Sequence, residues 1–99
     1  MNVKVQSVQF DADQKLLDYV DKKAGKLSQM ADNILSAEVI LRLDKSETNE
    51  NKIAEVSLEV PKLTGLFAKR QCKTFEEAVD LSVDALKKQL VKAKEKQRD

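Results

Sequence analysis

Hydrophobic and polar residues alternate along several segments of the chain, and such alternation predicts strands with one buried face. The clearest run covers 37–43, and a second covers 53–60. The polar stretch 44–51 between them predicts a hairpin with a long solvated tip. A further strand is expected over 2–10, where the alternation changes phase midway and indicates a bulge or the end of the strand.

The segment 63–72 predicts a fourth strand, with a turn around Thr64 and Gly65. Pro61 ends the strand before it, because proline has no backbone N–H to donate to a sheet.

Two other segments repeat apolar residues every three or four positions, the spacing of a helix with one buried face. The first is expected over 14–30, with Asp11 or Asp13 as its cap. The second begins after Thr74, which forms a capping box with Glu77, and runs for about 20 residues. Its buried stripe is predicted to contain Phe75, Ala78, Val79, Ser82, Leu86, Leu90 and Ala93.

The order strand, helix, strand, strand, strand, helix predicts an α+β sandwich of two layers. Its four-stranded, mostly antiparallel sheet would carry both helices on one face and leave the other face exposed. Ninety-nine residues suit a single domain, so we expect residues 1–99 to form one unit. No stretch approaches the ~18 consecutive apolar residues of a membrane span, and no signal or transit peptide is visible, so we expect a soluble protein.

The residue types exclude several kinds of chemistry. The chain has no histidine and one cysteine, which rules out histidine-dependent catalysis, histidine metal sites and an internal disulfide. Its acidic pairs lie in the first turns or on the solvent flanks of the predicted helices, where dipole and capping explain them. They are Asp11/Asp13, Glu76/Glu77 and Asp80/Asp84. With no glycine-rich phosphate loop either, we expect no enzyme, cofactor, metal or small-molecule substrate.

Two single residues have alternative interpretations. Cys72 lies among cations that would lower the pKa of a thiol, but a buried structural thiol is favoured because the chain has no histidine and no second cysteine. Phe67, beside the predicted turn, is expected to fill the core, and the alternative is that it stacks on a nucleic-acid base.

The net charge of +1 conceals an uneven distribution. Residues 1–61 hold eight basic against eleven acidic side chains, a net charge of −3, whereas 62–99 hold ten against six, a net charge of +4. This polarity indicates an anionic partner that meets one surface of the molecule.

Basic residues recur at helical spacing on both predicted helices. One stripe on the first helix contains Lys15, Lys22 and Lys26; the second helix carries Lys87, Lys94 and Arg98 on one flank and Lys88, Lys92 and Lys96 on the other. If the helices lie side by side, two stripes face each other across a groove that would follow a phosphate backbone. The alternative is a solvated surface of snorkelling lysines.

A second basic cluster surrounds the fourth predicted strand and contains Lys62, Lys69, Arg70 and Lys73. It either extends the binding face or protects an edge strand from aggregation by its charge.

Three segments resemble the ribosome hibernation-promoting factors, a family that includes the ribosome-associated translation inhibitor A proteins. They are the opening Met-Asn-Val-Lys-Val, the helix 17–23 and the helix 78–96, and the resemblance extends over nearly the whole chain. It implies a β-α-β-β-β-α fold similar in layout to double-stranded RNA-binding domains. It also implies a cytoplasmic protein that binds the small ribosomal subunit under stress or in stationary phase, occupies the channel for messenger RNA and the A- and P-site transfer RNAs, and inhibits translation.

The same resemblance implies which side chains contact ribosomal RNA phosphates. The matching positions are Lys22, Lys23, Lys26, Lys87, Lys88, Lys92, Lys94 and Lys96, and further candidates are Lys15, Lys69, Arg70, Lys73 and Arg98. The basic segment 68–73 departs from the family, which usually has an acidic run there.

The chain ends directly after the second helix, so it resembles the short form that lacks a dimerising domain, and we expect a monomer off the ribosome. Two alternatives stay open: a general module for structured RNA, and a protein-interaction domain that uses the uncovered sheet face or the edge of the hairpin.

Overall fold

The computed structural model of the protein describes residues 1–45 and 49–96. Its elements follow the predicted order. They are β1 (Asn2–Val8), α1 (Gln14–Gly25), the 3-10 helix η1 (Lys26–Gln29), β2 (Ser36–Leu43), β3 (Lys52–Glu59), β4 (Phe67–Cys72) and α2 (Phe75–Lys96). The predicted hairpin tip falls partly on residues 46–48, outside the described residues.

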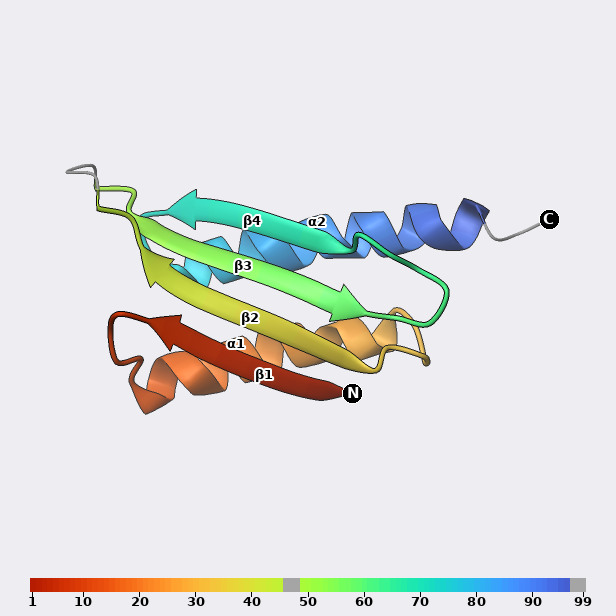
Figure 1. Ribbon diagram of the computed structural model, residues 1–99, viewed down its shortest axis with the longest axis horizontal. Helices are drawn as coiled ribbons and strands as arrows, with labels where there is room; N and C mark the ends of the chain where they lie inside the picture. Colours follow the sequence, from red (N-terminus) through yellow and green to blue (C-terminus); the bar gives the residue numbers. More distant parts are fainter. Residues whose placement is uncertain (46–48, 97–99) are drawn as a thin grey trace.

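The four strands form one sheet in the order β1-β2-β3-β4. β1 pairs with β2 in parallel, and the other two neighbouring pairs are antiparallel. Both helices lie on the same side of the sheet and leave its other side uncovered (Figure 1). The predicted two-layer α+β sandwich is therefore confirmed.

Side-chain caps fix the start of each helix. The Asp13 carboxylate accepts a hydrogen bond of 2.9 Å from the Leu16 N–H, and the Thr74 hydroxyl accepts one of 3.1 Å from the Glu77 N–H. The α-helical part of the first helix ends at Gly25, before the predicted residue 30, and the chain tightens into η1.

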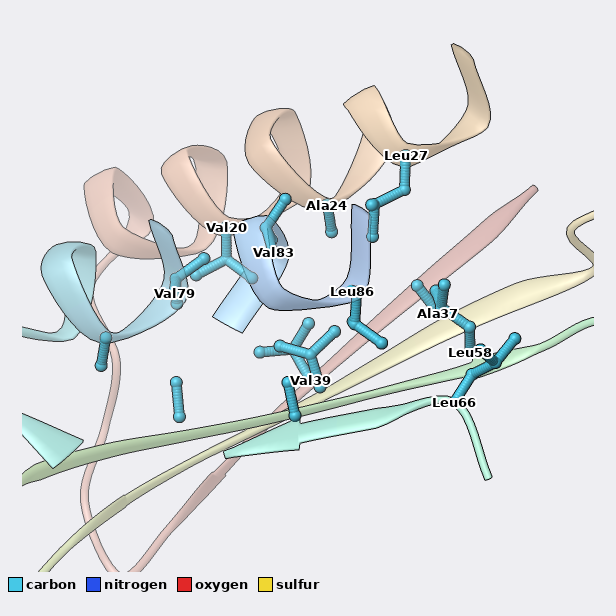
Figure 2. Packing of buried hydrophobic residues seen from close by; sticks show 14 of the residues in the cluster. Val20, Ala24, Leu27, Ala37, Val39, Leu58, Leu66, Val79, Val83 and Leu86 are labelled. Carbon is cyan, nitrogen blue, oxygen red and sulfur yellow. The ribbon is translucent and has the colours of Figure 1, made fainter. Parts of the chain in front are cut away.

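The core lies between the helix layer and the sheet (Figure 2). α1 and η1 contribute buried apolar side chains, α2 contributes a stripe of them, and the inward faces of β2, β3 and β4 complete the cluster. The largest fully buried side chains are Leu27, Leu41, Leu86, Leu90, Val20, Val39, Val56, Val79 and Ser82. One continuous core therefore holds both helices against the sheet.

The change of phase in the first strand marks its end. β1 stays in register with β2 up to Val8, and Gln9 then adopts a left-handed backbone with φ of 64°. This turn directs Phe10 back to the helix side, where its ring stacks on Phe75 with centroids 4.9 Å apart. Of the two alternatives, the strand end is confirmed over the bulge.

The fourth strand is shorter than predicted, because the chain turns through 60–66. Lys62 and Gly65 both have left-handed backbones, with φ of 69° and 75°, and strand geometry excludes such values. A single bridge joins Val60 to Leu63 before β4 begins at Phe67.

β4 is an edge strand whose side chains alternate between the two sides of the sheet. Ala68 and Cys72 are buried against the helices, and burial raises the pKa of the Cys72 thiol, so the prediction of a structural thiol is confirmed. Phe67 has the opposite phase and is 46% exposed. The prediction that Phe67 fills the core is therefore wrong.

Candidate nucleic-acid interface

The two helices run parallel, which gives the helix layer an acidic end and a basic end. The contact between Tyr19 and Asp80 lies in the N-terminal half of both helices, whereas Lys94 reaches Met30 near their C-terminal ends. Figure 1 shows the same direction for both, with the last turns of α2 projecting beyond the strands. Acidic side chains at helix N-termini and basic ones at C-termini complement the helix dipoles. Apart from Lys15 in the first turn of α1, the lysines of both helices lie in their middle or C-terminal turns, towards one end of the layer.

The groove predicted between the helices is present, but it is not purely basic. A hollow of about 160 Å³ is lined by Lys23, Lys26, Asp80, Val83, Asp84 and Lys87. We call these residues the interhelix seam. Three cations face two carboxylates there, so the seam carries a net charge of +1 and attracts a phosphate chain only weakly.

A polar cluster within the seam joins the two helices. The Tyr19 hydroxyl lies 2.7 and 2.8 Å from the two carboxylate oxygens of Asp80, and the Lys23 ammonium lies 3.4 Å from one of them. The same ammonium lies 5.7 Å from the centre of the Tyr19 ring. The hydrogen bond to Asp80, then burial, then the charges of Asp80 and Glu76 raise the pKa of Tyr19 to about 12. Asp80 is therefore a bridging residue and does not simply lie on the solvent flank where the sequence analysis put it.

Lys94 also makes an internal contact. Its ammonium donates to the carbonyl oxygen of Met30, directly after η1. This bond satisfies a carbonyl at a helix C-terminus, where cations are favourable. Lys94 thus lies on the α1 side of α2, as its predicted stripe requires.

The other side of α2 forms a broader basic surface with β4 and the turn before it. Two adjacent hollows, of about 390 and 410 Å³, both contact Gln89 and Lys92. Their charged lining residues are Lys62, Arg70, Asp84, Lys88, Lys92 and Lys96. We call the five cations of this set the α2-β4 flank. Among the described residues none of these five forms an ion pair, so their charges are available to a ligand.

The cluster predicted around the fourth strand does not form one patch. Arg70 lines the flank, and its guanidinium donates to the Lys69 carbonyl at 2.7 Å. Lys69 has the opposite phase and lies in register with Glu55 on the uncovered face. Lys73 follows the strand at its other end and is exposed.

The remaining candidates lie outside both surfaces. Lys15 and Lys22 are exposed on α1 but do not line the seam, and Arg98 falls outside the described residues. All the proposed RNA contacts stay predictions, since geometry places them without testing what they bind.

The sequence analysis missed Tyr19. Its spacing offered a signal, because Tyr19, Lys23 and Lys26 are four and then three residues apart and therefore share one flank of α1. Its partner Asp80 is 61 residues away along the chain, and only the packing of the helices brings the two together.

Two absences apply to residues 1–45 and 49–96. No group of three or more potential ligand side chains in this part of the chain could hold a metal ion. None of its helices combines the length and the apolar character needed to cross a membrane.

Comparison with known proteins places this arrangement in a family. The family model described as Sigma 54 modulation protein/S30EA ribosomal protein matches residues 3–98. The chain belongs to this family. A relative from Azotobacter vinelandii, named ribosome hibernation promoting factor, is 35% identical over 98 residues, which make up 98% of this chain and 86% of the relative. The family resemblance seen in the sequence is therefore confirmed.

Solved structures of similar proteins share the S30EA fold. A ribosomal subunit interface protein from Coxiella burnetii superposes with a TM-score of 0.82 at 23% identity, covering 95% of this chain and 98% of its own. The N-terminal domain of Thermus thermophilus Protein Y gives a TM-score of 0.79 at 26% identity, covering 94% and 99%. The α+β sandwich is thus the architecture of both proteins.

Proposed function

We propose that this chain is a ribosome-associated hibernation factor of the cytoplasm. It binds the small ribosomal subunit in the channel for messenger RNA and the A- and P-site transfer RNAs, and it inhibits translation under stress or in stationary phase. Ribosome association is supported by membership of the S30EA family and by the names of the relatives from Azotobacter vinelandii and Coxiella burnetii. The protein acts by occupying the channel, without catalysis.

The observation that carries this proposal is the unpaired charge of the α2-β4 flank. Three of its five cations lie on one side of α2, a helix that projects from the sandwich, and the other two come from β4 and the turn before it. Lysine and arginine side chains neutralise phosphates without reading sequence, and their affinity falls steeply with salt. A projecting basic helix on a narrow body, with extents of 48 × 24 × 17 Å, suits a channel lined by ribosomal RNA.

The uncovered sheet face gives less support to a protein-interaction domain. Its central residues include the ion pair of Arg42 with Glu55, beside Glu38 and Ser57 on the same side. Ile40 and the buried Ile53 also lie on this side, but the face is mostly polar and internally paired. It therefore differs from the exposed apolar patches that mark protein interfaces. We therefore favour RNA as the partner, with residues 1–99 acting as one binding domain and as a monomer off the ribosome.

Cosedimentation with purified small subunits tests the proposal. The wild type is compared with Lys88→Glu/Lys92→Glu on the flank and with Lys4→Glu/Lys45→Glu, a control with the same change of net charge at exposed positions elsewhere. We expect the wild type and the control to sediment with subunits and the flank variant to stay in the supernatant. Circular dichroism verifies that all three are folded.

Salt dependence separates electrostatic binding from other modes. With about six phosphate contacts, the affinity should fall roughly a thousandfold between ~50 and ~200 mM salt. The proposal would be contradicted if the affinity did not change with salt concentration. It would also be contradicted if the flank variant bound subunits as tightly as the wild type. Equal affinity for a random RNA duplex would favour the general RNA-binding module instead.

Occupation of the channel has its own test. If the protein lies where messenger RNA and transfer RNA bind, then subunits preloaded with both ligands should take up less of it, and the protein should inhibit translation in vitro. Unchanged uptake by preloaded subunits would place the binding site elsewhere on the ribosome.

A further inference from the structure

Phe67 presents an aromatic ring to solvent at the edge of the sheet. It begins β4, and among the described residues it is the one exposed aromatic side chain. The alternation of β4 turns Phe67 to the uncovered face, because Ala68 and Cys72 face the helices. Its cross-strand neighbour is the small residue Ser57, which leaves the ring accessible.

The backbone that carries this ring is held in place from α2. The Gln89 side chain accepts from the Phe67 N–H at 3.2 Å and donates to the Phe67 carbonyl at 2.8 Å. These two bonds satisfy the outward backbone groups of an edge strand, and they fix the position of residue 67 relative to the helix. The ring is therefore presented by a rigid element.

The charges around Phe67 differ on the two sides of its strand. Gln89 contacts both hollows of the α2-β4 flank, so the cations of the flank lie directly across the strand from the ring. The uncovered face instead carries as many carboxylates as cations, and one carboxylate is already paired with Arg42. These side chains are Glu38, Glu55 and Glu59 against Lys4, Arg42 and Lys69. A phosphate chain is therefore attracted to the flank more strongly than to the face, and a base attached to that chain reaches the ring across the edge of the sheet.

We infer that Phe67 is a stacking platform for one unpaired RNA base whose neighbouring phosphates lie on the α2-β4 flank. This inference rests on the proposed function and deepens it by naming unpaired RNA as the ligand of this edge. An aromatic face stacks on any base, so the contact adds affinity without selecting a sequence. A base on a flexible strand extends away from its phosphates and can cross the edge, whereas a base inside a duplex cannot.

Tryptophan fluorescence tests stacking directly, because the chain has no tryptophan. Phe67→Trp places an indole at the edge, and Leu43→Trp, at a 42% exposed position at the end of β2, is the matched control. The probes are an oligouridine and an abasic ribose-phosphate oligomer of the same length. We expect the oligouridine to quench the Phe67→Trp emission, the abasic oligomer to leave it nearly unchanged, and neither to quench the control.

Affinity measurements complete the test. Because one stacked base is lost, the Phe67→Ala variant should bind the oligouridine between about fivefold and a hundredfold more weakly than the wild type does. Its affinity for the abasic oligomer should be unchanged. Phe67→Leu keeps apolar volume without an aromatic face, so it should lose nearly as much. Since the ring is exposed, neither substitution removes a core contact.

The results separate this inference from the proposed function. If oligouridine binds Phe67→Ala or Phe67→Leu as it binds the wild type, stacking is overturned, while sedimentation of the wild type with subunits still supports the hibernation factor. If the wild type does not bind ribosomes but oligouridine alone quenches the indole of Phe67→Trp, the stacking inference is supported and the proposed ribosomal role is wrong. Equal quenching by both oligomers also overturns stacking.

Discussion

The interhelix seam and the α2-β4 flank lie on opposite sides of α2, and both contain several lysines. The electrostatic environments of these lysines nevertheless differ. In the seam, Lys23 pairs with Asp80, and Lys26 and Lys87 share a hollow with Asp80 and Asp84. In the flank, five cations share two hollows with Asp84 alone. Helical spacing identifies basic stripes, but the packing of the neighbouring element decides whether their charge is free.

The difference follows from which element each side of α2 meets. Towards α1 it meets the polar flank of an amphipathic helix, where the Tyr19 hydroxyl and the Lys23 ammonium contact the Asp80 carboxylate. Towards β4 it meets an edge strand, where Gln89 binds backbone and leaves the cations unpaired among the described residues. The seam therefore stabilises the helix layer, and the flank is left for a ligand.

A direct contrast of the two surfaces should give the largest effect. The flank variant is Arg70→Glu/Lys88→Glu/Lys92→Glu, and the seam variant is Lys23→Glu/Lys26→Glu/Lys87→Glu, with the same change of net charge. Each neutralised phosphate contributes about eightfold to affinity at ~0.1 M salt relative to 1 M, so the flank variant should lose roughly 500-fold in affinity for small subunits. Because the seam has a net charge of only +1, the seam variant should lose about eightfold or less in affinity for small subunits.

Salt titrations and thermal unfolding complete that contrast. The flank variant should lower the slope of log affinity against log salt by about three and leave the unfolding midpoint unchanged. The seam variant should lower the midpoint, because Lys23→Glu sets two carboxylates against each other. Equal losses of affinity in the two variants would show that both surfaces contact RNA equally, and the contrast drawn between them would be wrong.

Tyr19→Phe tests whether the seam is structural. It removes the hydroxyl that lies between α1 and Asp80, and a hydrogen bond to a charged group at a partly exposed site contributes about 1 kcal/mol to the free energy of unfolding. Denaturant unfolding should show this loss, while affinity for small subunits stays within about twofold of the wild type. A large loss of ribosome binding with unchanged stability would instead make Tyr19 part of the interface.

The pKa of Tyr19 adds a pH signature. It is raised from 10.0 to about 12 in the folded protein, so between these values the unfolded chain has lost the proton that the folded protein keeps. The contribution of this tyrosine is complete below pH 10 and is lost as the pH rises to about 12. The difference in stability between wild type and Tyr19→Phe should shrink over that range. Absorbance titration of the single tyrosine in the chain measures the pKa itself.

Short-range patterns were sufficient to predict the fold. The alternation over 37–43 predicts a strand, and the structure has β2 at Ser36–Leu43. The capping box predicts a helix after Thr74, and α2 begins at Phe75 with that hydroxyl bond in place. These signals lie within one element, so each can be read without knowing what packs against it.

What the sequence could not supply depends on contacts between elements. Whether Lys23 is free depends on Asp80, which approaches it only through helix packing. The orientation of Phe67 depends on where β4 begins, and the left-handed backbone of Lys62, a residue with no strong turn preference, shifts that start. A basic stripe therefore predicted candidates for RNA binding, but not which of them keep their charge available.

Asp80→Asn sharpens the comparison by making the seam more like the flank. It removes one of the two carboxylates that oppose the seam lysines and frees Lys23 from its ion pair. If ribosomal RNA passes near the seam, affinity should rise by at most about eightfold, the equivalent of one more phosphate contact at ~0.1 M salt. Binding assays at several salt concentrations measure it, with Asp18→Asn on exposed α1 surface as the control for net charge. A decrease in affinity would mean that Asp80 itself orients the binding surface.

Gln89→Ala gives the smallest expected effect and tests the flank from the structural side. Gln89 lines both flank hollows and also supports the edge strand, through its two bonds to the Phe67 backbone. Because these groups are exposed, water replaces the lost bonds, and the free energy of unfolding should fall by only about 0.5 kcal/mol. Amide hydrogen exchange at Phe67 should nevertheless accelerate, since its N–H then lacks a protein acceptor. If exchange at Phe67 is as slow in the variant as in the wild type, the bond to Gln89 does not protect this N–H, and the rigid presentation of the ring does not depend on α2.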